Sequence, residues 1–418
     1  MKTLSISINN KYVVETIVFI SYTLFAMAWV GGTASMSQIM ASMNINSLAS
    51  ASFISGAVTL AKIVGTFIAA WLAVKLGVKY AFFLSGVLIS MGLLTPFAPN
   101  YELLLISRFL MGLGGAFMIV YFNPIVMSWF EPEERATING INAVAFNLGT
   151  GIILWQMANF NQLTESWQNT LIVFSLASIF FSFAWLLVKE NIDEKQSQTQ
   201  QEEQKHYFYS DGLKDKFTWV YALTYSGILA FYLCLFTFYP KAGISQSALL
   251  IGFGIIGTLA GIFYSKKFTL RVPVIRWSGL IIVITVFGLS FSSSELVQTI
   301  SAMLLGFFIF FPVTALITIP HELPKMTGQK ITVIFSLFYS ISYMVGTLSL
   351  WLFGTFVDNN QGDYTWAFAF TTLISGTFFV GSFFLTETGK KPSVKSETGK
   401  KPSDNAESLV KQESSCEV

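Results

Sequence analysis

Twelve stretches of this 418-residue chain are apolar over about 20 residues each, and no other feature restricts its fold as strongly. A helix of about 20 apolar residues spans the hydrocarbon core of a bilayer. Since 53% of all residues are hydrophobic and only 11% are charged, we expect an all-α membrane protein with 12 transmembrane helices. The stretches cover residues 14–39, 47–73, 80–98, 102–130, 137–160, 168–188, 218–240, 245–265, 274–291, 296–320, 330–354 and 365–386.

A hairpin pattern occurs twice in the chain. Residues 108–153 form two apolar stretches around the short charged elbow EPEER, which predicts an antiparallel helical hairpin. A similar hairpin follows in the second half, with Gly306 in the place of Gly112 and Gly346 in the place of Gly149. The segments VGTFIAAWLAVKLGVK and IGTLAGIFYSKKFTLR also align. Two copies of one membrane unit explain these repeats, and many transporters are built from paired units.

Two polar segments divide the chain. Residues 189–217 are rich in glutamine and mixed in charge, which predicts a cytoplasmic linker between residues 1–188 and 218–386, each a six-helix bundle. Residues 387–418 contain ETGKKPS twice and too few apolar residues to fold, so we expect a disordered cytoplasmic tail.

Lysine and arginine gather in the loops on one side of the expected membrane. Cytoplasmic loops carry more of these residues than external loops, so the pattern places both termini in the cytoplasm. We expect a multi-pass integral membrane protein of a bacterial cell inner membrane. The residues on the inner side include Lys75, Lys79, Arg135, Lys266, Lys267 and Arg271, against Lys241 alone on the outer side.

Several function classes do not fit this sequence. A net charge of +2, with most basic residues in loops rather than on one face, argues against nucleic acid as a partner. The chain has no Walker loop, no metal-ligand spacing and no nucleophile with a paired base, so we expect neither an enzyme nor a cofactor or metal site.

Three segments resemble the major facilitator superfamily of secondary transporters. The loop AWLAVKLGVK keeps the family pattern at Lys75, Gly77 and Lys79, but Val74 stands where the family has an acidic residue. The glycine-rich fourth stretch after Arg108 and the elbow WFEPEER are also similar to the family. The segment NGINAVAFNLGTGI is similar to the nitrate/nitrite and cyanate porter branch, although the arginines of its second and eighth helices are missing here.

This resemblance implies the major facilitator fold, with a solute cavity lined chiefly by the first, fourth, seventh and tenth helices. Small residues also allow helices in membranes to pack closely. We therefore expect gating or packing roles for Lys75, Gly77, Lys79, Gly112, Arg135, Gly149, Gly257, Gly261 and Gly346.

Lys62 and Arg108 are the two basic residues that fall well inside expected spans. A charge at such depth costs at least about 2.5–3.5 kcal/mol, so it usually faces a cavity or a partner. An unpaired cationic interior favours an anionic ligand. Alternatively, Lys62 extends to the inner surface, and Arg108 bonds carbonyl groups of neighbouring helices. The nearest acidic residues lie towards span ends: Glu15, at the inner mouth of the first helix, Glu102, Glu295 and Glu322.

Buried amides and phenols complete the candidate site. Asn142 and Asn147 need partners inside the membrane, either on another helix or in the solute, and a phenol within a span needs one too. The candidate solute-binding residues are Lys62, Arg108, Tyr22, Tyr121, Asn142, Asn147, Tyr225 and Tyr232.

Together these features predict a secondary active transporter that moves a small anionic solute by alternating access. Proton-coupled uptake and a polycarboxylate or siderophore-like cargo remain open, and no buried carboxylate is evident as a proton carrier. The expected partners are the solute, the bilayer and, if transport is coupled, H+, with the chain a monomer or weak oligomer. The alternatives are an efflux carrier of the same fold and a transporter-like sensor or assembly protein.

Overall fold

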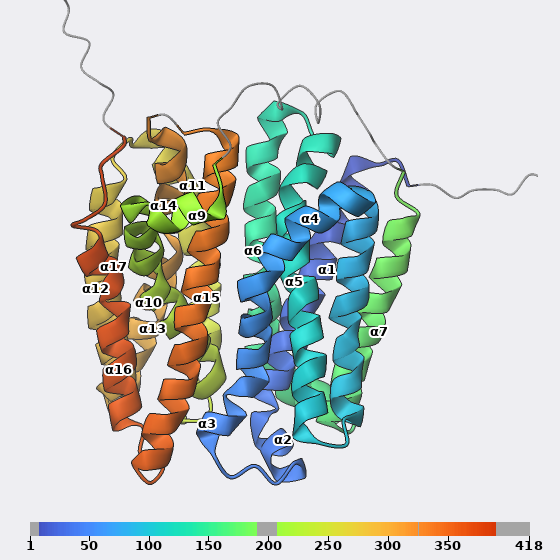
Figure 1. Cartoon of the computed structure of the whole chain (residues 1–418). Coiled ribbons are helices and arrows are strands. Elements are labelled where there is room, and N and C mark those ends of the chain that lie inside the picture. The colour runs from blue at the N-terminus through green and yellow to red at the C-terminus, as the bar shows by residue number, and fades with distance from the viewer. Residues whose placement is uncertain (1–7, 190–206, 325, 390–418) are drawn as a thin grey trace, which may run out of the picture.

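A computed structural model of the chain describes residues 8–189, 207–324 and 326–389. In these ranges the regular elements are helices, joined by short loops, and one isolated bridge pairs Ile8 with Val188. The helices run side by side in two groups (Figure 1). Most of the expected linker and the expected tail lie outside the described residues.

The first group holds the helices that precede the expected linker. Their bounds are α1 Lys11–Ala34, α2 Met36–Ser42, α3 Leu48–Ala51, α4 Phe53–Ser90, the 3-10 helix η1 Met91–Phe97, α5 Tyr101–Trp129, α6 Pro132–Leu163 and α7 Trp167–Leu186.

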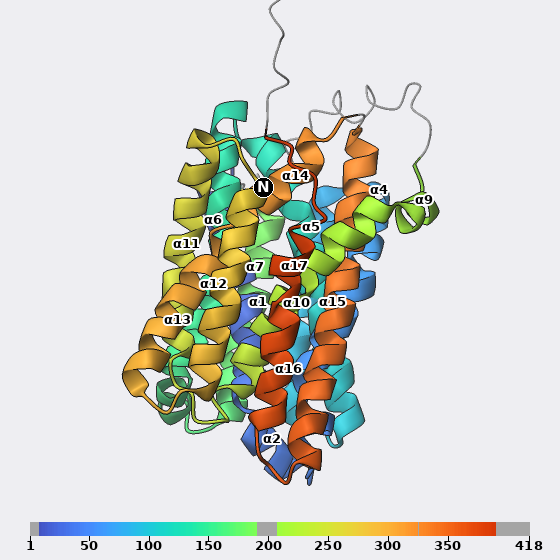
Figure 2. The ribbon, with the colours of Figure 1, turned by 90° about the vertical axis from the view of Figure 1, so that its left-hand side faces the viewer.

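The second group follows the linker, and Figure 2 shows it face on, with α12, α13 and α16 in front. The bounds are α9 Tyr209–Lys214, α10 Lys216–Phe238, α11 Ser247–Lys267, α12 Val272–Phe291, α13 Glu295–Phe310, α14 Val313–Glu322, α15 Gly328–Asn359, α16 Thr365–Ser375 and α17 Thr377–Gly381.

The helices account for the 12 expected membrane crossings. In the described part, 10 helices are long and apolar enough to cross a membrane, and a shorter apolar helix covers Thr365–Gly381. One of the 10, Phe53–Phe97, contains two expected crossings, between which Gly77 adopts a φ of 77°. Glycine tolerates this positive φ. The expected tenth crossing is interrupted at Pro312, between α13 and α14, because proline cannot donate a helical hydrogen bond.

Polar residues begin several of the long helices. Asn10 caps α1 by accepting a hydrogen bond from Tyr12 N, and Asn100 caps α5 by accepting one from Leu103 N. Such side chains satisfy backbone donors that a first helical turn leaves free. Short polar elbows therefore separate long apolar helices without exposing unpaired backbone to lipid.

Equivalent glycines pack equivalent helices in the two groups. Gly112 of α5 lies so close to α4 that a Cβ would be 2.7 Å from Val58 O, and Gly306 of α13 contacts Leu250 O of α11 in the same way. Gly257 and Gly261 of α11 likewise lie against the α13 backbone and its continuation at 311. The repeated sequence pattern thus corresponds to repeated close helix contacts.

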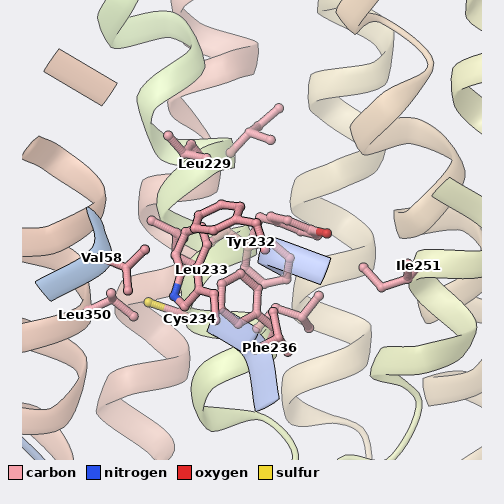
Figure 3. Packing of buried hydrophobic residues seen from close by; sticks show 14 of the residues in the cluster. Val58, Leu229, Tyr232, Leu233, Cys234, Phe236, Ile251 and Leu350 are labelled. Carbon is pink, nitrogen blue, oxygen red and sulfur yellow. The ribbon is translucent and has the colours of Figure 1, made fainter. Parts of the chain in front are cut away.

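The two groups share a buried core. Figure 3 shows part of this cluster, in which Leu233 and Phe236 of α10 lie among Val58 of α4, Ile251 of α11 and Leu350 of α15. Residues of both groups are therefore packed together near the middle of the molecule.

We call the end where α7 finishes and α9 begins the linker end, and the end with α2 and α3 the opposite end (Figure 1). At the opposite end, Asp358 of α15 accepts hydrogen bonds from Ser47 Oγ and from the backbone N of Leu48 and Ala49, at 2.8–2.9 Å. Deeper in the bundle, the hydroxyls of Thr59 and Thr347 are 2.6 Å apart. These contacts hold the two groups together at the opposite end.

Candidate functional site

A cavity of about 650 Å³ lies between the two groups of helices. Its lining residues come from α1, α4, α5 and α6 on one side and from α10, α11, α13, α14 and α15 on the other. Trp29 and Lys62 line it at mid-bundle, and Asn139, Lys266 and Arg271 line it near the linker end. The cavity therefore extends from the middle of the bundle to the linker end.

Lys62 lies at the deep end of this cavity. Its side chain is 2% exposed, and Nζ donates a hydrogen bond to Tyr343 OH at 3.2 Å. Among the described residues, no carboxylate forms a salt bridge with it. Four aromatic ring centroids lie 4.8–5.3 Å from Nζ, a geometry that stabilises a cation in part. These rings belong to Phe25, Trp29, Phe146 and Tyr343.

Arg108 lies outside the cavity lining, in the packed core of the first group. Its Nε donates to Ile54 O at 2.9 Å, Nη1 to Ala28 O at 3.0 Å and Nη2 to Trp29 O at 2.6 Å. Nη2 also lies 3.4 Å from Thr33 Oγ1. These hydrogen bonds join Arg108 of α5 to carbonyl groups of α1 and α4.

Three of the four expected tyrosines reach the cavity: Tyr22, Tyr225 and Tyr232. Tyr232 OH donates to Asn147 Oδ1 at 2.9 Å, and this bond links α10 to α6 across the two groups. Tyr121 does not line the cavity, because it is fully buried and its hydroxyl donates to Ala69 O at 2.9 Å.

Asn142 lines the cavity near a carboxyl group that the sequence places at the mouth of the first helix. Asn142 is 2% exposed and Glu15 is 6% exposed, and the two side chains lie beside each other with no further hydrogen-bond partner in the described part. Glu15, Tyr22 and Trp29 follow one another at intervals of seven residues, or about two helical turns, so they lie on one face of α1. The expectation that no carboxylate is buried is therefore wrong for Glu15. Its spacing from Tyr22 and Trp29 is the sequence signal that places it on the same face of α1 as these cavity-lining residues.

The eleventh crossing, α15, contributes more to the cavity than the family resemblance implies. Tyr339 and Tyr343 both line it, since a spacing of four residues places them on one face of the helix. The fourth crossing, α5, supplies only Ile119 and Phe122. Tyr343 is not among the four expected tyrosines, because the eleventh helix lies outside the four helices that the family resemblance implies for the cavity.

Arg271 at the cavity mouth is neutralised by neighbours in its own group. Its Nη2 lies 2.8 Å from Glu322 Oε1. The carboxylate of Glu387 accepts hydrogen bonds from Arg271 N and Val272 N at 2.9 and 3.0 Å. Among the described cavity-lining residues, Lys62 is therefore the deeply placed cation without an acidic partner.

The residues expected to gate or pack the helices lie mostly at helix contacts and elbows. Lys75 Nζ lies 4.8 Å from the Trp71 ring centroid, and Arg135 donates to Phe130 O and Met127 O at the end of α5. Lys79 accepts a hydrogen bond from Trp185 Nε1 through its carbonyl group, at 2.9 Å. Two further glycines lie against neighbouring helices: Gly149 against Thr23 O of α1 and Gly346 against Leu233 of α10.

Comparison with known proteins identifies a family model and relatives that match this chain. A sequence model described as Major Facilitator Superfamily matches residues 18–347. The uncharacterized protein Cj0987c of Campylobacter jejuni is 28% identical over 310 residues, which cover 71% of this chain and 95% of that protein. The uncharacterized protein mhp246 of Mesomycoplasma hyopneumoniae is 23% identical over 188 residues, or 43% of this chain and 39% of that protein.

Solved transporter structures share the fold at low sequence identity. The inward-open xylose transporter XylE from E. coli superposes with a TM-score of 0.72 at 12% identity, covering 91% of this chain and 98% of that one. A bacterial homolog of the human lysosomal transporter Spinster, inward-facing and occupied, gives 0.66 at 16% identity, with 90% and 96% covered. A D-xylose-proton symporter gives 0.69 at 13% identity, with 92% and 100% covered.

Proposed function

We propose that this chain, which belongs to the Major Facilitator Superfamily, carries a small anion across the membrane by alternating access. Family membership indicates a transporter rather than an enzyme. The observation that carries the choice of an anion is Lys62, an amine at the closed end of the cavity, to which no carboxylate of the described residues is paired.

The electrostatics of the cavity support this proposal. Removing a charged amine from water is costly unless an opposite charge or hydrogen bonds compensate it. Lys62 has one hydrogen bond, to Tyr343, and the faces of four rings. A bound anion would supply the missing charge, and it would be held where Tyr22, Tyr225 and Tyr232 can orient it.

The size of the cavity suits an organic anion. Its volume of about 650 Å³ lies in the range of pockets that enclose drug-sized ligands, about 300–1,000 Å³. Carboxylates, including polycarboxylates of the citrate type, therefore fit as well as smaller ions. Aromatic walls around Lys62 would contact the apolar part of such a solute.

The positions of the contacts between the groups support alternating access. The Asp358 and Thr59–Thr347 contacts join the groups on the opposite side of Lys62 from the cavity mouth. With both termini in the cytoplasm, as the positive residues in the loops favour, the cavity would face inward. Rocking of the two groups about the Lys62 region would then expose the same amine to the other side.

A transport screen tests this proposal. Purified chain in proteoliposomes would be offered radiolabelled nitrate, lactate and citrate, and uptake would be compared with that into empty liposomes. Lys62→Met should lower the affinity for the transported anion by about 10- to 100-fold, as expected for loss of a charged hydrogen bond. Lys62→Arg should retain part of the affinity for the transported anion.

The matched control is Lys214→Met, at an exposed site on α9 that does not line the cavity. Its affinity and rate should equal those of the wild type. If Lys62→Met carried the same anion with unchanged rate and affinity, the anion site would be refuted. Flux of any anion by the wild type would exclude a non-transporting sensor.

A further inference from the structure

Aromatic side chains line the cavity in two layers, and the deeper layer surrounds Lys62. The ring centroids of Trp29 and Tyr343 lie 4.8 and 5.0 Å from Lys62 Nζ. Tyr232 belongs to the same layer, because Phe236 packs with its ring centroid 5.6 Å from those of both Trp29 and Tyr232. A solute that reaches Lys62 therefore meets aromatic rings from both groups of helices.

The second layer lies towards the linker end, where α1, α10 and α15 all begin (Figure 1). Tyr22 and Tyr225 precede the deeper layer by seven residues, or about 10 Å of helix, and Tyr339 precedes Tyr343 by four residues, or about 6 Å. Tyr339 interacts electrostatically with both of the other phenols. These three tyrosines line the cavity, and none of their hydroxyls forms a hydrogen bond to another described residue.

The other basic residues of the lining do not add to the charge of Lys62. Arg271 is paired with a carboxylate in its own group. On α11, Gly254 lies against Phe310, whose ring centroid is 5.5 Å from that of Tyr232. Lys266 follows Gly254 by 12 residues, or about 18 Å of helix. A small solute in the deeper layer therefore does not reach Lys266.

Lys62 and Tyr343 together offer hydrogen-bond donors that match a carboxylate. The ammonium group of Lys62 has three N–H donors and uses one of them on Tyr343 OH. No described residue accepts the O–H of Tyr343, which therefore remains free to donate. A carboxylate has two acceptor oxygens, so one can accept from Lys62 and the other from Tyr343.

The balance of charge narrows the class of anion. The cavity volume of about 650 Å³ admits polycarboxylates, but Lys62 balances one negative charge. Each further carboxylate at this depth would be removed from water without a partner, which is costly. Rings in the walls pack well against another ring, since aromatic pairs are favourable at centroid distances of 4.5–7 Å. One carboxylate attached to an aromatic ring therefore matches the deeper layer.

We propose that the transported anion is a phenolic monocarboxylate, a solute with one aromatic ring that carries a carboxylate and, at its opposite end, a hydroxyl group. The carboxylate is held by Lys62 and Tyr343, the ring lies between the two aromatic layers, and the hydroxyl group bonds to Tyr339. Tyr339 has this role because it is the free phenol closest to the deeper layer along its helix. The proposal rests on the proposed anion transport and names the chemical class of its solute.

Equilibrium binding to the purified full chain in lipid nanodiscs tests this proposal. The probes are 4-hydroxybenzoate, benzoate, citrate and the neutral methyl ester of 4-hydroxybenzoate. 4-Hydroxybenzoate should bind at least about tenfold more tightly than citrate or the ester, because only a single negative charge matches Lys62. It should bind about threefold to tenfold more tightly than benzoate, which is the net effect of one hydrogen bond.

The decisive variant is Tyr339→Phe, which removes the hydroxyl and keeps the ring. It should weaken binding of 4-hydroxybenzoate by about threefold to tenfold and leave that of benzoate within about twofold of the wild type. Lys62→Met should instead weaken both acids by about 10- to 100-fold. A folding defect would also weaken both acids alike, so the difference between them isolates the role of Tyr339. The matched control is Tyr80→Phe, at a site on α4 that is 54% exposed and does not line the cavity, and it should bind both acids as the wild type does.

Two results would overturn the phenolic monocarboxylate. One is citrate binding as tight as that of 4-hydroxybenzoate, and the other is a Tyr339→Phe variant that weakens both acids equally or neither. If nitrate, lactate or citrate were transported in a way that depends on Lys62 while neither aromatic acid bound, anion transport would stand and this proposal would fail. If the neutral ester bound as tightly as the acid and Lys62→Met weakened neither, both proposals would fail, because the site would not recognise charge.

Discussion

Replacing Arg108 by methionine should destabilise the chain without removing its solute site. The guanidinium donates three hydrogen bonds of 2.6–3.0 Å to backbone carbonyls of α1 and α4. Polar contacts between helices in membranes are worth about 0.6 to 1.7 kcal/mol each. Methionine fills much of the same volume but cannot donate, so the loss in free energy of unfolding should be about 2–5 kcal/mol.

The assay is equilibrium unfolding of the purified chain in mixed micelles, followed by tryptophan fluorescence, together with anion affinity in proteoliposomes. Arg135→Met is the matched control, because Arg135 also donates to two backbone carbonyls, but at the elbow that ends α5. It should lose less stability than Arg108→Met. A fully stable Arg108→Met with a greatly weakened affinity for the anion would refute the packing role and return Arg108 to the solute site.

Two further predictions concern helix contacts. Asp358→Asn should weaken the contact of α15 with Ser47 and α3. The population of molecules open at the opposite end, measured by spin-label distances between the two groups, should therefore rise by about threefold to tenfold. Unchanged distances would show that this contact does not hold the end closed. Gly261→Val should abolish correct folding, because the Cβ of valine would meet the backbone at Phe311. Folding would be measured as the amount of monodisperse protein after membrane extraction. A well-folded variant would contradict the close contact of the helices.

Much of the architecture was accessible from the sequence, because the bilayer imposes a simple length requirement on apolar helices. The duplicated glycine pattern also predicted close helix contacts, and Gly112 and Gly306 occupy equivalent ones. Local signals were sufficient for these conclusions, since each depends on residues within one helix or one hairpin.

The candidate site was accessible only in part. A charge deep in a span must face a cavity or a partner, and this rule applied equally to Lys62 and Arg108. Their different surroundings depend on which helices pass beside them. Carbonyl groups of α1 and α4 take up the donors of Arg108, whereas Lys62 projects among aromatic rings beside the cavity.

Glu15 is another residue for which the sequence and the tertiary structure determine different properties. Its place near the start of α1 predicts a carboxyl group at the aqueous mouth, but packing against α6 buries it beside Asn142. Position along a helix gives depth in the membrane, which the sequence by itself determined for this chain. Which neighbour each polar side chain meets depends on contacts between segments more than a hundred residues apart, and only the tertiary structure decided them.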